Sequence, residues 1–118
     1  MRAILQSALL GCALLLGAGA SAWAADEPVR IVLKDNQFTP AEIRVLAGQR
    51  FRIELHNQGS APAEFESSDM RFEKIVVPGG KITVSAGPLK PGTYRFFDEY
   101  HPEATGTFIA VQGLAAEK

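Results

Sequence analysis

The sequence predicts an all-β protein, a Greek-key sandwich of about seven to eight short strands. Two observations support this fold class. Short segments that alternate polar and apolar residues, such as Phe51, Ile53 and Leu55 with charged residues between them, recur along the chain between turns rich in Gly, Pro and Asn. No segment carries a sustained period of 3.6 residues, which an amphipathic helix would require. With 118 residues in all, the chain has room for one small domain.

Residues 1–24 are predicted to be a cleavable signal peptide, and residues 25–118 a single domain. Arg2 gives a positive start, residues 3–19 are apolar and uncharged, and residues 22–24 offer the small-x-small pattern read by signal peptidase. A membrane anchor is the alternative, but the apolar run is barely long enough and lacks a charged stop-transfer flank. The signal predicts export to the periplasm.

Cysteine and charge exclude several classes of function. Cys12 is the only cysteine, and it lies in the middle of the apolar run, which disfavours lipidation. The predicted mature chain therefore has no disulfide, no catalytic cysteine and no thiolate ligand. A formal net charge of −1 without a dense basic cluster predicts no nucleic-acid partner. Membrane contact is expected only through partner proteins.

The expected strands follow from β-branched runs and from alternation, and turn residues separate them. Residues 35–37, 47–49, 57–60 and 78–80 are predicted turns, while residues 38–40 are expected to form an extended corner. One helical turn is expected near residues 67–70. In chain order, the expected strands are residues 29–33, 42–46, 51–55, 63–67, 72–77, 81–85, 93–97 and 106–111.

The segment from Tyr94 to His101 is the most informative stretch. It is predicted to be a strand that runs into a loop carrying an imidazole. Tyr94 and Phe96 share one face of that strand by the period of two, and Asp98 and His101 lie just beyond it. The rest of the chain is expected to be the scaffold that presents this loop.

Several motifs resemble those of the cupredoxins, in which Tyr-x-Phe-x-Cys-x-x-His delivers a thiolate and an imidazole to copper. The resemblance covers nearly all of the predicted mature chain and implies the cupredoxin form of the Greek-key sandwich. The matching segments are Phe38-Thr39-Pro40-x-x-Ile43-x-Val45-x-Ala47-Gly48, Asn57-x-Gly59, Pro91-Gly92-Thr93-Tyr94-x-Phe96 and His101.

This chain departs from the family pattern at three of the four copper-ligand positions. Asp98 occupies the cysteine position, and Ala63 follows Pro62 where the first histidine is expected. The axial methionine expected after His101 is missing. The colour of a blue copper site comes from the copper–thiolate bond, and the same bond helps to set the redox potential of the copper. The resemblance therefore excludes a conventional blue copper electron carrier.

Oxygen ligands replace the lost ones, so we predict a metal site at Asp98, His101, Glu64 and Glu66. Carboxylates with one imidazole suit Cu(II), Fe(II), Fe(III) or Mn(II) better than Cu(I). The expected metal is Cu(II), iron or both, in a colourless or pale site. A paired-carboxylate hydrolase built on Glu66 and Asp98 would need a substrate cleft that such a small sandwich rarely offers.

Each predicted ligand also has a simpler interpretation. His101 could be a solvated surface residue, and Asp98 could cap a turn by accepting backbone N–H groups. Glu64 and Glu66 share the strand face opposite Phe65, so both could face water. Further residues left open are Met70, which could bind Cu(I) or fill a gap in the core, and the carboxylates Glu99 and Glu103.

The Glu-x-Glu at residues 64–66 and the segment 97–102 resemble the cupredoxin-like proteins of bacterial periplasmic iron-uptake systems. That resemblance implies capture, oxidation or transfer of ferrous iron, with a periplasmic iron-binding protein and a membrane iron permease as partners. Oxidation of Fe(II) assisted by bound Cu(II) would make the protein an enzyme, and the sequence leaves this open. The alternatives are a metal-free interaction module that docks a basic partner, and a copper chaperone that uses His101 and Met70.

Overall fold

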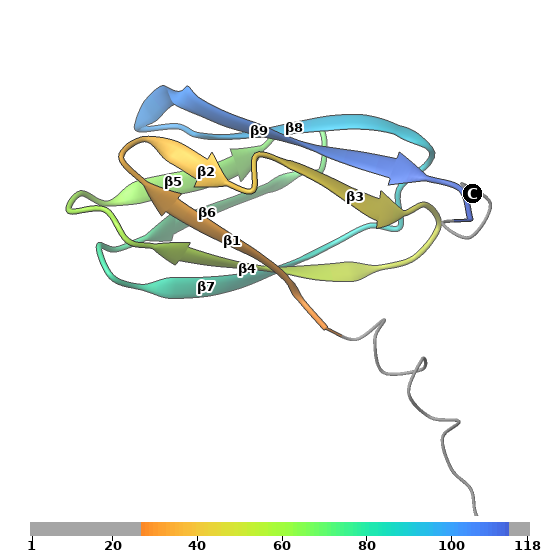
Figure 1. The fold of residues 1–118 in the computed structure, drawn as a ribbon, viewed down its shortest axis with the longest axis horizontal. Helices are drawn as coiled ribbons and strands as arrows, with labels where there is room; N and C mark the ends of the chain where they lie inside the picture. The colour runs from red at the N-terminus through yellow and green to blue at the C-terminus, as the bar shows by residue number, and fades with distance from the viewer. Residues whose placement is uncertain (1–26, 114–118) are drawn as a thin grey trace, which may run out of the picture.

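The computed structural model of the chain describes residues 27–113, and the predicted signal peptide and its cleavage site lie outside this range. The described residues form two β-sheets packed face to face (Figure 1). The sandwich predicted from the sequence is confirmed. Its strands are β1 (Val29–Lys34), β2 (Gln37–Thr39), β3 (Glu42–Leu46), β4 (Phe51–Asn57), β5 (Ala63–Ser67), β6 (Phe72–Val76), β7 (Lys81–Ala86), β8 (Gly92–Asp98) and β9 (His101–Val111).

One sheet has the strand order β2-β1-β4-β7, and the other has the order β3-β9-β8-β5-β6. Two pairs are parallel, β1 with β4 and β3 with β9, and the remaining pairs are antiparallel. The chain crosses between the sheets several times, as a Greek-key sandwich requires. Strand β6 therefore lies at one edge of the five-stranded sheet, beside β5.

Four phenylalanine rings fill the centre of the sandwich. Phe38, Phe65, Phe96 and Phe108 are each at most 4% exposed, and their centroids lie 4.9 to 5.9 Å apart in contacting pairs. These separations and tilted or edge-on orientations are those in which aromatic pairs add stability beyond area burial. Gly106, opposite Phe96 on β9, has no side chain because a Cβ there would overlap the Phe96 ring.

The structure differs from the expected elements at two places. Residues 37–39 form a short strand instead of only an extended corner, because Asp35 and Asn36 adopt positive φ angles of 52° and 59° and close a tight hairpin with β1. The last strand begins at His101 instead of Gly106. Its first residues pair with the end of β8, so the predicted metal loop is reduced to a turn at residues 99–100. The number of strands in the described range is therefore nine.

None of residues 27–113 belongs to a helix that could span a lipid bilayer. The single helical turn expected near residues 67–70 is a hydrogen-bonded turn between β5 and β6. The Arg71 N–H donates to the Ser67 carbonyl at 2.7 Å, and the Ser67 hydroxyl accepts from the Met70 N–H at 3.0 Å. This turn fixes the register in which β5 and β6 pair.

Candidate metal centre

Strand β5 carries candidate ligands on its outer face and supports the others on its inner face. Its residues alternate strictly between buried and half-buried, as expected for a strand with one face on the core. Phe65 is fully buried, whereas Glu64 and Glu66 point away from the core. The sequence predicted this division, because a period of two separates the glutamates from the phenylalanine.

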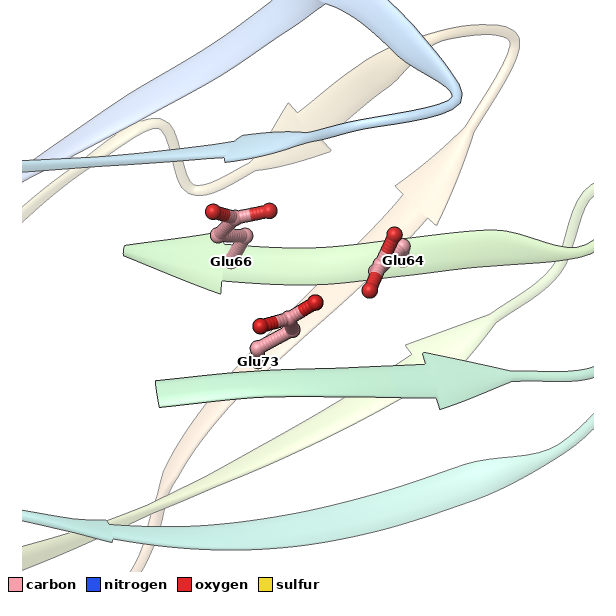
Figure 2. Close-up of side chains that lie close together, drawn as sticks. All are labelled: Glu64, Glu66 and Glu73. Carbon is pink, nitrogen blue, oxygen red and sulfur yellow. The ribbon is translucent and has the colours of Figure 1, made fainter. Parts of the chain in front are cut away.

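The outer face brings Glu64 and Glu66 together with a third carboxylate, Glu73. One carboxylate oxygen from each of the three lies within 4.8 Å of the others. Figure 2 shows Glu64 and Glu66 on β5 and Glu73 on the neighbouring β6, all on the same side of the sheet. Glu66 and Glu73 are direct cross-strand partners. Like charges placed directly opposite each other destabilise a sheet, so this arrangement is electrostatically unfavourable without a cation.

The crowding of carboxylates raises the pKa values of two of them. A hydrogen bond to Glu73, partial burial and the negative charges of Glu73, Glu66 and Glu99 raise the pKa of Glu64 to about 7. Burial, followed by the charges of Glu99 and Glu73, raises the pKa of Glu66. A carboxylate beside other carboxylates keeps its proton to lower the repulsion. A metal cation would relieve the same repulsion by replacing the proton.

Asp98 occupies a different environment, on the inner face at the end of β8. It is 1% exposed and is the cross-strand partner of the core residue Phe65. Its Oδ1 accepts hydrogen bonds from the Glu64 backbone N–H at 2.9 Å and the Tyr100 backbone N–H at 3.0 Å. The simpler interpretation of Asp98, a cap that accepts backbone N–H groups, describes these contacts. A role as a metal ligand stays a prediction.

His101 is held beside Asp98 at the start of β9. The Nδ1 atom of His101 lies 3.0 Å from Asp98 Oδ2, and the histidine side chain is 36% exposed. The two residues line a cavity of about 230 Å³, bounded by the turn at residues 34–36 and the loop at residues 57–63. Ala63, at the position where the sequence resemblance leads us to expect a histidine ligand, lines the same cavity.

The four predicted ligands therefore divide into two pairs on opposite faces of one sheet. Asp98 and His101 lie together by the cavity, and Glu64 and Glu66 lie together with Glu73 on the outer face. Strand β5 separates them, although the Glu64 backbone links the two places. Its N–H bonds to Asp98, and its carbonyl accepts from the Glu99 N–H at 2.8 Å. A single site that uses all four side chains is not present in the described structure.

Glu73 was not among the residues predicted from the sequence. The signal that identifies it is the turn expected after Ser67. If that turn closes a hairpin between the predicted strands 63–67 and 72–77, Ser67 pairs with Phe72 and Glu66 then faces Glu73. Glu99, which the sequence left open, acts on the pKa values of both Glu64 and Glu66.

The structure also places Met70, which the sequence left open as a ligand, and His56, the second histidine of the chain. Met70 packs against the core cluster as a partly buried residue, which matches its interpretation as a gap-filling side chain. Met70 follows the carboxyl end of β5, whereas Asp98 contacts that strand at Glu64, near its amino end. Three residues of extended strand, about 10 Å, separate the two regions. His56 bonds to Gln58 at 3.2 Å on the exposed side of β4.

The chain is similar to known proteins both in sequence and in fold. It belongs to the family of cupredoxin-like domains, whose family model matches residues 6–110. A relative in Rickettsia prowazekii (strain Madrid E), the uncharacterized protein RP394, is 39% identical over 83 residues. The match covers 70% of this chain and 66% of that protein, just under two thirds of its length.

Solved structures with this fold include copper proteins. The metal-binding domain of the Cu(I)-exporting P-type ATPase of Streptococcus pneumoniae D39, solved with Cu(I), has a TM-score of 0.68 at 16% identity, covering 75% of this chain and 88% of the domain. Auracyanin from Roseiflexus castenholzii has a TM-score of 0.62 at 17% identity, with 74% and 98% covered. The purple cupredoxin from Nitrosopumilus maritimus gives 0.58 at 16% identity, with 70% and 99% covered. At these identities the likeness shows the fold.

The residues present do not fit a blue copper centre. That centre needs a thiolate and two imidazoles facing one point. Here the cavity beside His101 presents the carboxylate of Asp98 and the methyl group of Ala63 in place of the thiolate and the second imidazole. Asp98 Oδ1 already accepts two hydrogen bonds, and Oδ2 lies 3.0 Å from His101 Nδ1. The chain thus keeps the cupredoxin scaffold and has lost the donor set for blue copper.

Proposed function

We propose that this protein binds ferrous iron as cargo through the carboxylates of Glu64, Glu66 and Glu73. The observation that carries the proposal is the convergence of three carboxylate oxygens within 4.8 Å on one sheet face. An octahedral cation with metal–oxygen bonds of about 2.1 Å holds adjacent oxygens about 3.0 Å apart and opposite ones about 4.2 Å apart, so side-chain rotations would draw these oxygens closer together around the ion.

The donor chemistry favours iron or manganese over Cu(I). Carboxylates are hard ligands, and the cluster contains neither sulfur nor imidazole. Three carboxylates also interact more strongly with Fe(III) than with Fe(II), since the Coulomb energy grows with the charge of the cation. This difference lowers the cost of removing an electron from bound Fe(II). Cu(II), when bound at His101, would accept this electron and become Cu(I).

We place this activity in the periplasm, as part of an iron-uptake system. The proposal rests on the signal-peptide pattern of residues 1–24 and on the resemblance of residues 63–70 and 97–102 to members of such systems. The partners would be a periplasmic iron-binding protein and a membrane iron permease, and membrane contact would occur only through these partners. An iron permease gene beside the gene for this protein and recovery of the protein in the periplasmic fraction are the expected observations.

A metal titration of the purified protein tests the proposal. Mn(II) is a suitable probe because it is stable in air and has the hard-ligand preference of Fe(II). We expect one Mn(II) site by calorimetry and electron paramagnetic resonance, weakened at least about 100-fold in Glu64→Gln/Glu66→Gln/Glu73→Gln. The matched control, Glu27→Gln/Glu42→Gln/Glu54→Gln, changes the net charge by the same amount. Equal loss in both triple variants, or no Mn(II) site in the wild type, would refute the proposal.

A second candidate function, an interaction module without metal, is favoured by one specific observation. Ile75, Val77 and Tyr100 are exposed by 57%, 60% and 45%, and Ile75 is the cross-strand partner of Glu64. Exposed apolar residues beside an acidic face are typical of a surface that docks a basic partner. The Mn(II) titration separates the two functions, because docking does not require the metal.

A further inference from the structure

The hydrogen bonds of Asp98 determine which nitrogen of His101 carries the proton. Asp98 is 1% exposed, so its oxygens have little access to bulk water. Two backbone N–H groups, from Glu64 and Tyr100, bond to Oδ1 and stabilise its negative charge. The remaining oxygen, Oδ2, lies 3.0 Å from His101 Nδ1.

An ionised carboxylate can only accept hydrogen bonds, so the hydrogen in the Asp98–His101 contact belongs to the imidazole. A carboxylic acid is ordinarily a much stronger acid than an imidazolium, and the shared proton therefore resides on nitrogen. The neutral ring must then be the Nδ1–H tautomer. Its Nε2 atom then keeps a lone pair that can bind a metal ion.

We infer that Asp98 is a positioning residue that fixes His101 in the Nδ1–H tautomer, leaving Nε2 as the donor atom for a borderline metal ion such as Cu(II). Histidines that bind metals usually donate their other ring N–H to a carboxylate or carbonyl group, which orients the ring and raises its basicity. The Asp98–His101 pair has this arrangement. The metal half of the inference rests on the proposed function, and the tautomer half does not.

Asp98 therefore positions the histidine, whereas the sequence predicted it to be a metal ligand. A metal bound through Nε2 lies across the ring from Asp98, so the two residues do not chelate one ion together. The pair has open space beside it, because His101 and Asp98 both line a cavity of about 230 Å³. At about 30 Å³ for each water molecule, that volume accommodates an ion with several waters.

Nitrogen-15 NMR of the metal-free protein tests the tautomer directly. His56→Gln removes the other histidine of the chain, so that one imidazole remains. At a pH where titration shows the ring to be neutral, we expect the Nδ1–H tautomer. Adding Asp98→Asn should convert it to the Nε2–H tautomer. The asparagine oxygen must still accept from the Glu64 and Tyr100 N–H groups, which leaves its NH₂ facing Nδ1.

The same tautomer in both proteins, or Nε2–H in the protein that retains Asp98, would overturn the inference. A purely structural role for Asp98 would not change the tautomer. If Asp98→Asn fails to fold, the protein with Asp98 still decides the matter. The NMR spectrum of the protein that retains Asp98 must show a proton on His101 Nδ1. That proton must show a coupling across the hydrogen bond to the Asp98 carboxyl group.

Electron paramagnetic resonance with Cu(II) tests the metal half. The His56→Gln protein should show coupling to an imidazole nitrogen, and the coupling should disappear in His56→Gln/His101→Gln. Asp98→Asn should weaken Cu(II) binding at this site by about 10- to 100-fold, the usual effect of losing such a partner. Absence of imidazole coupling, or an affinity that Asp98→Asn leaves unchanged, would refute it. The iron proposal is judged separately, by Mn(II) at the three glutamates.

Discussion

The outer carboxylate cluster and the inner Asp98–His101 pair use the same strand in opposite ways. On the inner side, the β5 backbone satisfies Asp98, which accepts the Glu64 N–H at 2.9 Å. On the outer side, the Glu64 side chain leaves that strand to meet Glu66 and Glu73, and the three carboxylates repel one another. Glu64 thus stabilises the buried carboxylate of Asp98 through its backbone N–H, while its side chain adds negative charge to the outer cluster.

The comparison shows why a carboxylate alone does not identify a metal ligand. Asp98 occupies the position at which the sequence resemblance predicted a ligand, yet its oxygens already face N–H groups. Glu73 occupies no ligand position of the family pattern, yet it completes the group of oxygens close enough to share a cation. Binding capacity depends on which oxygens lack donors, because a ligand must give up its existing hydrogen bonds to reach a metal.

The largest effect is expected from Asp98→Ala, which should lower the free energy of unfolding by about 2 to 4 kcal/mol. The change leaves two backbone N–H groups, of Glu64 and Tyr100, without their acceptor, and each unsatisfied buried donor costs about 1 to 3 kcal/mol. Urea denaturation of the metal-free protein measures it. A loss below about 0.5 kcal/mol would mean that water replaces Asp98 as acceptor.

Mn(II) should stabilise the protein through the outer cluster and not through the Asp98–His101 pair. Mn(II) at 100 times its dissociation constant is expected to stabilise the folded protein by about 2.7 kcal/mol, since only the folded state assembles the site. In Glu64→Gln/Glu66→Gln/Glu73→Gln that stabilisation should vanish. Thermal unfolding with and without Mn(II) gives both values, and an equal shift in the two proteins would place the binding elsewhere.

A smaller effect concerns pH. The pKa of Glu64 in the folded protein, about 7, lies above its ordinary value of 4.5, so between these values the folded state binds more protons than the unfolded chain. Its contribution to stability is present below about pH 4.5 and is lost as the pH rises through about 7. Glu64→Gln should therefore stabilise the metal-free protein more at pH 8 than at pH 5. Urea denaturation at both pH values measures the difference.

The control for that experiment is Glu42→Gln, which neutralises an exposed carboxylate on β3, at the other edge of the same sheet. The pH dependence of the Glu64→Gln effect is measured against this variant. If Glu64→Gln shows no pH dependence, the crowding of carboxylates does not persist in solution.

The smallest effect is expected at an ordinary surface ion pair on the other sheet. The Arg30 Nε lies 3.4 Å from Glu54 Oε1, and the arginine side chain is 66% exposed. Exposed pairs of this kind contribute about 0.2 to 1 kcal/mol. Glu54→Gln should therefore change the free energy of unfolding by less than about 1 kcal/mol and leave Mn(II) binding intact. A loss of more than about 1 kcal/mol in the free energy of unfolding would mean that Glu54 stabilises the protein through more than its ion pair with Arg30.

The sequence by itself determined the sandwich, most of its strands and the two faces of β5. These features follow from local patterns, because alternation sends Phe65 into the core and Glu64 and Glu66 outward wherever the strand lies. The same patterns predicted the loss of the blue copper donors, since Asp98 and Ala63 can be read from the chain directly.

Only the tertiary structure decided how the predicted ligands are grouped. Pairing of β5 with β6 adds Glu73 to the glutamates, and pairing of β5 with β8 gives Asp98 the N–H of Glu64 as a donor. Such contacts depend on the register between strands that are distant in the chain, and a shift of one residue would reverse every face. The identity of a side chain is local, whereas the hydrogen bonds and charges that surround it are set by its neighbours in space.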